Sequence, residues 1–228
     1  MDCARKMKPN LSPMFAALIA AAGLATTAQA QVKGNIEAGE GKVAMCIGCH
    51  GIMDSKTHVP EVYHVPKIAG QNTKYIETVL GEYKKGTRKH PSMRGIAGSL
   101  TEQDIADVAA YYTALGEVKG APEVPATPPA ARADVAALLQ KGACVSCHGE
   151  NFNKPIDPAY PKIAGQYPDY LYAALTAYKD DTHSTWGRGN PIMAGMAKQF
   201  SNAELKAIAY YIGSLPGDVR TVPQGRFR

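Results

Sequence analysis

Two cysteine pairs, each followed at once by a histidine, are the residues of this chain best suited to chemistry. Residues 46–50 are Cys-Ile-Gly-Cys-His, and residues 144–148 are Cys-Val-Ser-Cys-His. This spacing is the attachment pattern of c-type haem, in which each thiol adds to one vinyl group and the histidine ligates the iron. The sequence therefore predicts two covalently attached haem c groups, held by Cys46, Cys49, Cys144 and Cys147, with His50 and His148 as proximal iron ligands.

Paired thiols also serve other purposes, so three alternatives stay open at this point. Two pairs can bind zinc, although pairs that share a zinc ion usually lie closer together in the sequence. Structural disulfides form in oxidising compartments, and a thioredoxin-like redox pair belongs to a βαβ unit, for which the chain shows no pattern. None of these alternatives requires a histidine after both pairs, so haem attachment is the favoured interpretation.

A methionine thioether at the sixth iron position gives a His/Met site, which raises the reduction potential and favours electron transfer. Two Pro-x-Met-x-Gly segments supply the candidates, and we predict Met93 and Met193 as axial ligands. Met45 and Met53 flank the first haem motif too closely to reach the other face of the ring. The remaining histidines recur at no equivalent places and are expected at the surface or in loops: His58, His64, His90 and His183.

Met196 competes with Met193 because both lie in the same segment. An internal repeat favours Met193: residues 93–97 align with residues 193–197, with the glycines and the alanines coinciding. Met196 then takes the place of Ile96, which cannot ligate iron and is expected to pack against its domain.

The repeat extends along most of the chain. Residues 66–71 (Pro-Lys-Ile-Ala-Gly-Gln) return at residues 161–166, and each copy precedes a helical pattern of apolar residues. The Pro-x-Met segments follow as predicted loops. Each half then ends in a helix whose first residues, after Thr101 or Ser201, resemble a capping box. No stretch shows sustained β alternation, so the repeat predicts an all-α protein made of two small domains, each wrapped around one covalently bound haem.

The domain boundaries follow from composition. Residues 1–30 have a basic start, a short apolar run and a small-x-small cleavage site, as in a signal peptide. The apolar run is shorter than the roughly 20 residues that a membrane span needs, so a retained anchor is the lesser alternative. We expect a first domain over 31–116, a Pro/Ala-rich linker over 117–132, and a second domain over 133–228. The last part of that domain, from Pro216, is polar and is expected to be loosely held.

The formal net charge is +5, and no interleaved basic and aromatic patch points to nucleic acid. Basic residues are more numerous around the first Pro-x-Met segment than around the second. We expect acidic partner proteins to dock there, although the same charges also suit a merely solvated face. The basic side chains are Lys84, Lys85, Arg88, Lys89 and Arg94.

With these motifs together, the chain resembles the dihaem cytochromes of the c4 type, over essentially all of residues 31–216. The resemblance implies two tandem cytochrome c-like domains that face each other. It places Cys46, Cys49, His50 and Met93 around the first haem, and the matching residues of the second half around the other. It also implies that the carbonyls of Pro66 and Pro161 accept the ring N–H of the two iron-ligating histidines.

The resemblance implies an electron carrier of the periplasm and no enzyme. Its partners would be redox proteins: a quinol-oxidising complex, a terminal oxidase or a small electron carrier, with peripheral membrane association left open. Similar dihaem chains also serve as the cytochrome subunit of a periplasmic oxidoreductase, such as a flavocytochrome or a dehydrogenase of sulfur compounds or alcohols. A haem peroxidase is a weaker alternative, because it needs an open iron position that both Met segments argue against.

Overall fold

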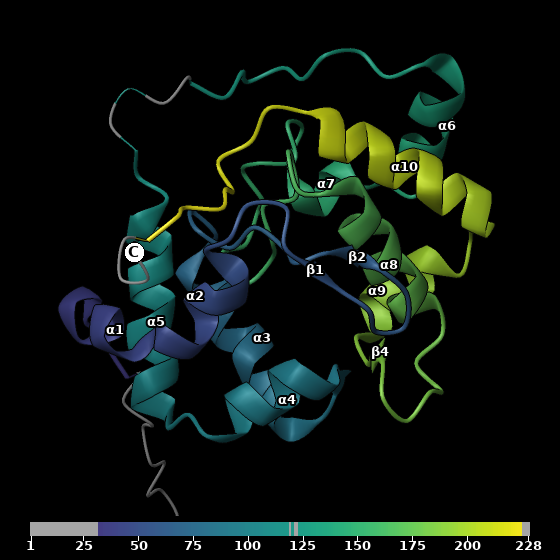
Figure 1. The fold of residues 1–228 in the computed structure, drawn as a ribbon. Helices are drawn as coiled ribbons and strands as arrows, with labels where there is room; N and C mark the ends of the chain where they lie inside the picture. Colours follow the sequence, from purple (N-terminus) through teal and green to yellow (C-terminus); the bar gives the residue numbers. More distant parts are fainter. Residues whose placement is uncertain (1–31, 119, 121–122, 225–228) are drawn as a thin grey trace, which may run out of the picture. The chain divides into compact units, whose positions relative to one another are not determined.

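A computed structural model describes residues 32–118, 120 and 123–224 (Figure 1). The predicted signal peptide lies outside these residues. Within them the chain forms ten helices and only four strands of two residues each, which confirms the all-α prediction. We refer to residues 32–116 as the first half and to residues 133–224 as the second half.

The first half contains five helices and three short strands. Strands β1 and β2 pair antiparallel as a small hairpin within this half. The helices are α1 (Ile36–Lys42), α2 (Ala44–His50), α3 (Thr73–Lys85), α4 (Pro91–Gly98) and α5 (Glu102–Leu115), and the strands are β1 (Lys56–Thr57), β2 (Tyr63–His64) and β3 (Arg88–Lys89).

The second half repeats the helices in the same order. Its single strand, β4, pairs antiparallel with β3 of the first half and places Arg188 opposite Arg88. The elements are α6 (Ala133–Lys141), α7 (Val145–His148), α8 (Pro168–Lys179), β4 (Gly187–Arg188), α9 (Pro191–Ala197) and α10 (Asn202–Ser214).

Each half has its own apolar core, as the helical periodicity predicts. The matching positions of α5 and α10 are all buried: Ile105, Val108, Ala109 and Tyr112 in the first half, and Leu205, Ile208, Ala209 and Ile212 in the second. The preceding long helices, α3 and α8, contribute Ile76, Leu80 and Leu171 to the same clusters. Two separate cores follow from the sequence duplication.

Both predicted capping boxes are present. The hydroxyl of Thr101 accepts the N–H of Asp104, and the carboxylate of Asp104 accepts the N–H of Thr101. Ser201 and Glu204 form the same reciprocal pair at the start of α10. The aspartate of the first box is one carbon shorter than glutamate and still reaches, so the two terminal helices begin alike.

The Pro-x-Met segments are short helices, and the prediction of loops was wrong. Proline occupies the first turn of α4 and of α9, where its missing N–H costs nothing. The preceding side chains supply the caps: Nδ1 of His90 accepts the N–H of Met93, and Oδ1 of Asn190 accepts the N–H of Met193. A capped proline start therefore overrides the loop-like composition.

The described part of the tail after α10, up to residue 224, is held firmly, contrary to the expectation of a loose end; residues 225–228 lie outside the described part. Leu215 and Val219 are buried, and Ala69 and Arg220 exchange main-chain hydrogen bonds. The tail, yellow in Figure 1, then runs beside α5, where the hydroxyl of Tyr111 donates to the side chain of Gln224. A segment that supplies both apolar anchors and main-chain pairing stays in place even when several of its side chains are charged or polar.

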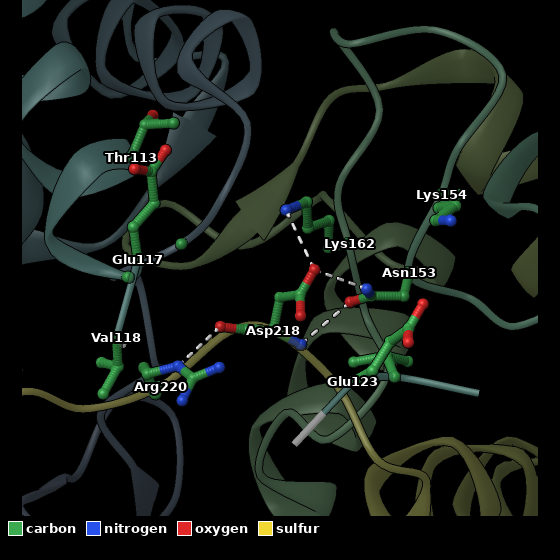
Figure 2. A pocket seen from close by; sticks show the side chains of 12 residues that line it. Thr113, Glu117, Val118, Glu123, Asn153, Lys154, Lys162, Asp218 and Arg220 are labelled. Carbon is green, nitrogen blue, oxygen red and sulfur yellow. Dashed lines mark hydrogen bonds and ion pairs between the residues drawn. The ribbon is translucent and has the colours of Figure 1, made fainter. Parts of the chain in front are cut away.

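A polar cavity of about 460 Å³ is lined by residues of the tail, of the end of the first half and the segment after it, and of the second half. Figure 2 shows the side chains that line it. The carboxylate of Asp218 accepts from the side chains of Asn153 and Lys162, and the Asp218 carbonyl accepts from Arg220. The tail is thus tied to the second half by charge and to the first half by its backbone.

Candidate functional site: two haem centres

The first haem motif forms the last turns of α2. Cys46 is half-buried and packs against the first core, while Cys49 is exposed. The two thiols are three residues apart on a helix, so they share a face and can reach one macrocycle. Burial raises the pKa of the Cys46 thiol to about 11. A thiol with this pKa is protonated at neutral pH.

His50 ends α2 with its ring held in one orientation. Nδ1 lies 2.9 Å from the carbonyl oxygen of Pro66, and because a carbonyl only accepts, Nδ1 must carry the proton. This leaves Nε2 as the basic nitrogen. Burial lowers the pKa of the His50 imidazole, which favours the neutral form that ligates metals.

The second motif reproduces this arrangement on a shorter helix. Cys144 caps α7 and packs against the second core, and His148 is buried at its end. Nδ1 of His148 donates to the carbonyl oxygen of Pro161 at 3.2 Å, and burial lowers the pKa of the imidazole. Both proline carbonyls therefore take the role that the resemblance implied.

The two candidate axial methionines occupy equivalent places. Met93 packs against the same core as Cys46, and Met193 is half-buried in α9. Met196 differs from the expectation: it is 36% exposed, and its sulfur accepts from the amide of Gln199. It does not pack inward as expected from the place of Ile96, which is itself half-buried in the first half.

The described residues also show the state of the paired thiols, which is relevant to the disulfide and zinc alternatives. All four cysteines of the motifs have free thiols, and within residues 32–118, 120 and 123–224 no three His, Cys, Asp or Glu side chains gather as a metal site. The arrangement that the structure does show, in both halves, is a thiol pair beside a histidine whose Nδ1 is engaged and whose Nε2 is the free basic nitrogen.

Two arginines lie opposite each other between the halves, where β3 pairs with β4. Arg88 is only 3% exposed and donates to the hydroxyls of Tyr75 and Tyr170. Arg188 donates to the same oxygen of Tyr170. Burial alone would raise the pKa of the Tyr170 phenol, but the two guanidinium groups lower it. The interface between the halves is therefore strongly positive at this point.

This cluster offers a test of whether the chain fits haem. Among the described residues neither arginine forms an ion pair, and the buried Nε of Arg88 has no hydrogen-bond partner. Buried cations are costly unless an anion neutralises them. Haem carries propionate carboxylates, and arginine binds carboxylates through paired N–H donors. The residues thus fit a group that brings negative charge to this interface.

The same burial corrects the predicted docking surface. Arg88 does not face solvent, and Nζ of Lys89 donates to the carbonyls of Asp181 and His183 in the other half. Sequence reasoning missed this because the short β3–β4 ladder gives no periodic signal. The side chains of Lys84, Lys85 and Arg94 remain exposed.

The comparisons with known proteins agree with the geometry. The cytochrome c family model matches residues 36–115 and 132–216, so fold and motifs define a protein with two cytochrome c domains in tandem. Cytochrome c4 of Azotobacter vinelandii is 32% identical over 203 residues, which cover 84% of this chain and 94% of that protein. The chain belongs to the cytochrome c4 family, whose members carry two covalently bound haem c groups and transfer electrons.

Two further relatives extend the comparison. The crystal structure of reduced recombinant cytochrome c4 from Pseudomonas stutzeri matches with a TM-score of 0.58 and 29% identity, over 80% of this chain and all of that one. A thiosulfate dehydrogenase electron acceptor of Stutzerimonas stutzeri is 30% identical over 179 residues, which cover 75% of this chain and 78% of that protein. Both relatives match over most of this chain, and one of them is named as the electron acceptor of a thiosulfate dehydrogenase.

Proposed function

We propose that this chain is a periplasmic electron carrier in which each half holds one haem between a histidine and a methionine. The thiols of Cys46 and Cys49 would attach the first haem, and those of Cys144 and Cys147 the second. His50 and Met93 would ligate one iron, and His148 and Met193 the other. The observation that carries the proposal is the pair of histidines whose Nδ1 is bonded to a proline carbonyl in the same way in both halves.

Bound haem supplies one-electron redox chemistry at its iron, and the protein supplies the setting. The proline carbonyls fix the orientation of the imidazoles and raise their basicity. The methionines would occupy the remaining iron positions and so exclude small substrates, which is why we propose electron transfer without enzymatic turnover. Arg88 and Arg188 would hold the propionates at the interface between the halves.

The proposed division of the chain is a signal peptide over 1–30, domains over 31–116 and 133–228, and the linker between them. Periplasmic location rests on the signal pattern and on the cytochrome c4 relatives. None of the described helices is long and apolar enough to cross a membrane.

For partners we propose a quinol-oxidising complex as donor and a terminal oxidase as acceptor. A specific observation favours a second donor: the similarity to a thiosulfate dehydrogenase electron acceptor. Stopped-flow reduction separates the two. The oxidised protein is mixed with a quinol-oxidising complex and quinol, or with a thiosulfate dehydrogenase and thiosulfate. Faster reduction by the first supports the shuttle, and faster reduction by the second assigns the chain to sulfur oxidation.

Carbon monoxide tests the proposal that both irons are fully ligated. Reduced protein at neutral pH should bind carbon monoxide poorly, because a methionine must first leave the iron. Rapid stoichiometric binding to either haem would show an open iron position and would revive an enzymatic function such as a peroxidase.

A further inference from the structure

The two copies of the Pro-Lys-Ile-Ala-Gly-Gln repeat bind each other through their last residue. The amide of Gln71 donates to the carbonyl of Lys162 at 2.9 Å and accepts the Lys162 N–H at 2.9 Å. Gln166 does the same with Lys67, at 2.8 and 2.9 Å. Both glutamine side chains are 4% exposed. Each half therefore binds the backbone of the other through one buried glutamine amide that makes two hydrogen bonds.

The gripped peptide group is the one that bonds the iron-facing histidine. The carbonyl of Pro66 and the N–H of Lys67 are the two ends of a single planar peptide bond. The carbonyl accepts from Nδ1 of His50, and the N–H donates to Gln166 of the other half. In the second half, the peptide between Pro161 and Lys162 joins His148 to Gln71 in the same way.

A hydrogen bond at one end of a peptide group strengthens the bond at the other end, because the two polarise each other. When the Lys67 N–H donates to a good acceptor, the Pro66 carbonyl becomes a better acceptor for His50. A stronger bond at Nδ1 makes Nε2 more basic. A more basic ligand stabilises ferric iron over ferrous iron and so lowers the reduction potential.

We propose that Gln166 tunes the first haem and Gln71 tunes the second, so that each half sets the potential of the opposite iron. Both glutamines are positioning residues that act through one peptide group on the proximal histidine. The inference rests on the proposed function, since it requires His50 and His148 to ligate iron.

The test is a spectroelectrochemical titration of the holoprotein and of matched variants. Gln166→Met has a side chain of similar length and offers no amide, so it should raise the potential of the first haem and leave the second unchanged. Gln71→Met should raise only the second. Lowering of one potential by Met93→Ala identifies the first haem. A shift of both haems together, or of the haem in the mutated half alone, would overturn the proposal.

Asn72→Ala is the control for loosening of the interface. Nδ2 of Asn72 donates to the carbonyl of Tyr160 in the other half, outside both peptide relays. Its loss should leave both potentials at their wild-type values. If Asn72→Ala shifts the first haem as Gln166→Met does, the potential reports on interface packing and the relay is wrong.

A second readout follows the hydrogen bond itself. In the reduced protein, the Nδ1–H proton resonance of His50 should move upfield in Gln166→Met and stay in place in Gln71→Met. If Gln166→Met does not fold, Gln166→Glu retains an acceptor oxygen and must leave the first potential unchanged or lowered; a rise would overturn the relay. Methionine bound to ferric haem iron gives a weak near-infrared thioether–iron charge-transfer band. If the wild-type protein lacks this band, the proposed function has failed, and this is visible before any variant is made.

Discussion

The two halves share the frame around the haem motif and differ in how that frame is braced. In the first half, buried Asp107 of α5 accepts from the N–H of Asn35, from Lys42 and from Gln103, and so ties α1 to α5. The equivalent residue of α10 is Ala207, which offers no such contact. Duplication preserved the thiol pairs and the histidine–carbonyl bonds of the two motifs, whereas the contacts that brace the surrounding helices diverged.

The segments after the two haem motifs differ in the same way. In the first half this segment forms the β1–β2 hairpin. At its end, Nδ1 of His64 lies 2.6 Å from Oδ2 of Asp169 in the other half. In the second half the segment turns inward: Phe152 is buried in its own core, and Asn153 bonds to the tail at Asp218. One segment thus serves the contact between the halves, and the other serves its own domain.

Removal of one thiol pair should produce the largest difference between the two halves, because it changes how many haems the protein carries. Cys46→Ala with Cys49→Ala should yield a protein that carries one haem, because the first half then has no covalent anchor. Cys144→Ala with Cys147→Ala should do the same for the second half. Mass spectrometry after acid-acetone extraction counts the haems that remain. Two haems in either double variant would contradict the assignment of the thiols.

Replacement of an axial methionine comes next. Met93→Ala and Met193→Ala should each abolish the near-infrared thioether–iron band of one haem and lower its potential. Met196→Ala is the matched control. Because Met196 is exposed, its loss should change stability by no more than about 0.5 kcal/mol and leave the band intact. A band that disappears with Met196 and survives without Met193 would show that the repeat alignment misplaces the ligand.

The Asp107 contacts predict a pH-dependent difference between the halves. The hydrogen bond from Lys42 lowers the pKa of the Asp107 carboxyl in the folded protein. Its stabilisation is therefore complete above the unfolded pKa of about 3.9 and is lost as the pH falls through the folded pKa. Asp107→Asn should cost about 1–3 kcal/mol at neutral pH, since buried partners lose their acceptor, and much less in acid.

Urea unfolding of the holoprotein at neutral and at acidic pH measures this difference. Asp134→Asn is the control, because Asp134 lies in the first turn of α6 and pairs with Arg132 at the exposed surface. It should change stability little at either pH. A cost for Asp107→Asn that is equal at both values would contradict the role assigned to its charge.

Apart from the control variants, the smallest predicted effects concern the helix caps, where the two halves should behave alike. Thr101→Ala and Ser201→Ala each remove the hydroxyl of a complete capping box, and each should cost about 1 kcal/mol. Thermal unfolding of both variants checks the prediction. A cost confined to one half would show that the reciprocal bonds at the other helix contribute nothing to stability.

The sequence is sufficient for features that depend on neighbours in the chain. The haem motifs, the capping boxes and the apolar faces of α5 and α10 each need only a short window, and all were predicted. The burial of Arg88, the grip of Gln166 on Lys67 and the docking of the tail at Ala69 join residues far apart in the sequence. The recurrence of glutamine at equivalent positions of the repeat was a signal for the Gln166 contact. The sequence could not say what that glutamine binds, because its partner lies in the other half.

We have proposed that each half holds one haem between a histidine and a methionine. The most direct measurement combines the mass of the holoprotein with the near-infrared spectrum of its ferric form, expressed per haem. We predict two covalent haems and a thioether–iron band of full intensity for both. A single haem, or a band that only one of two haems contributes, would contradict it.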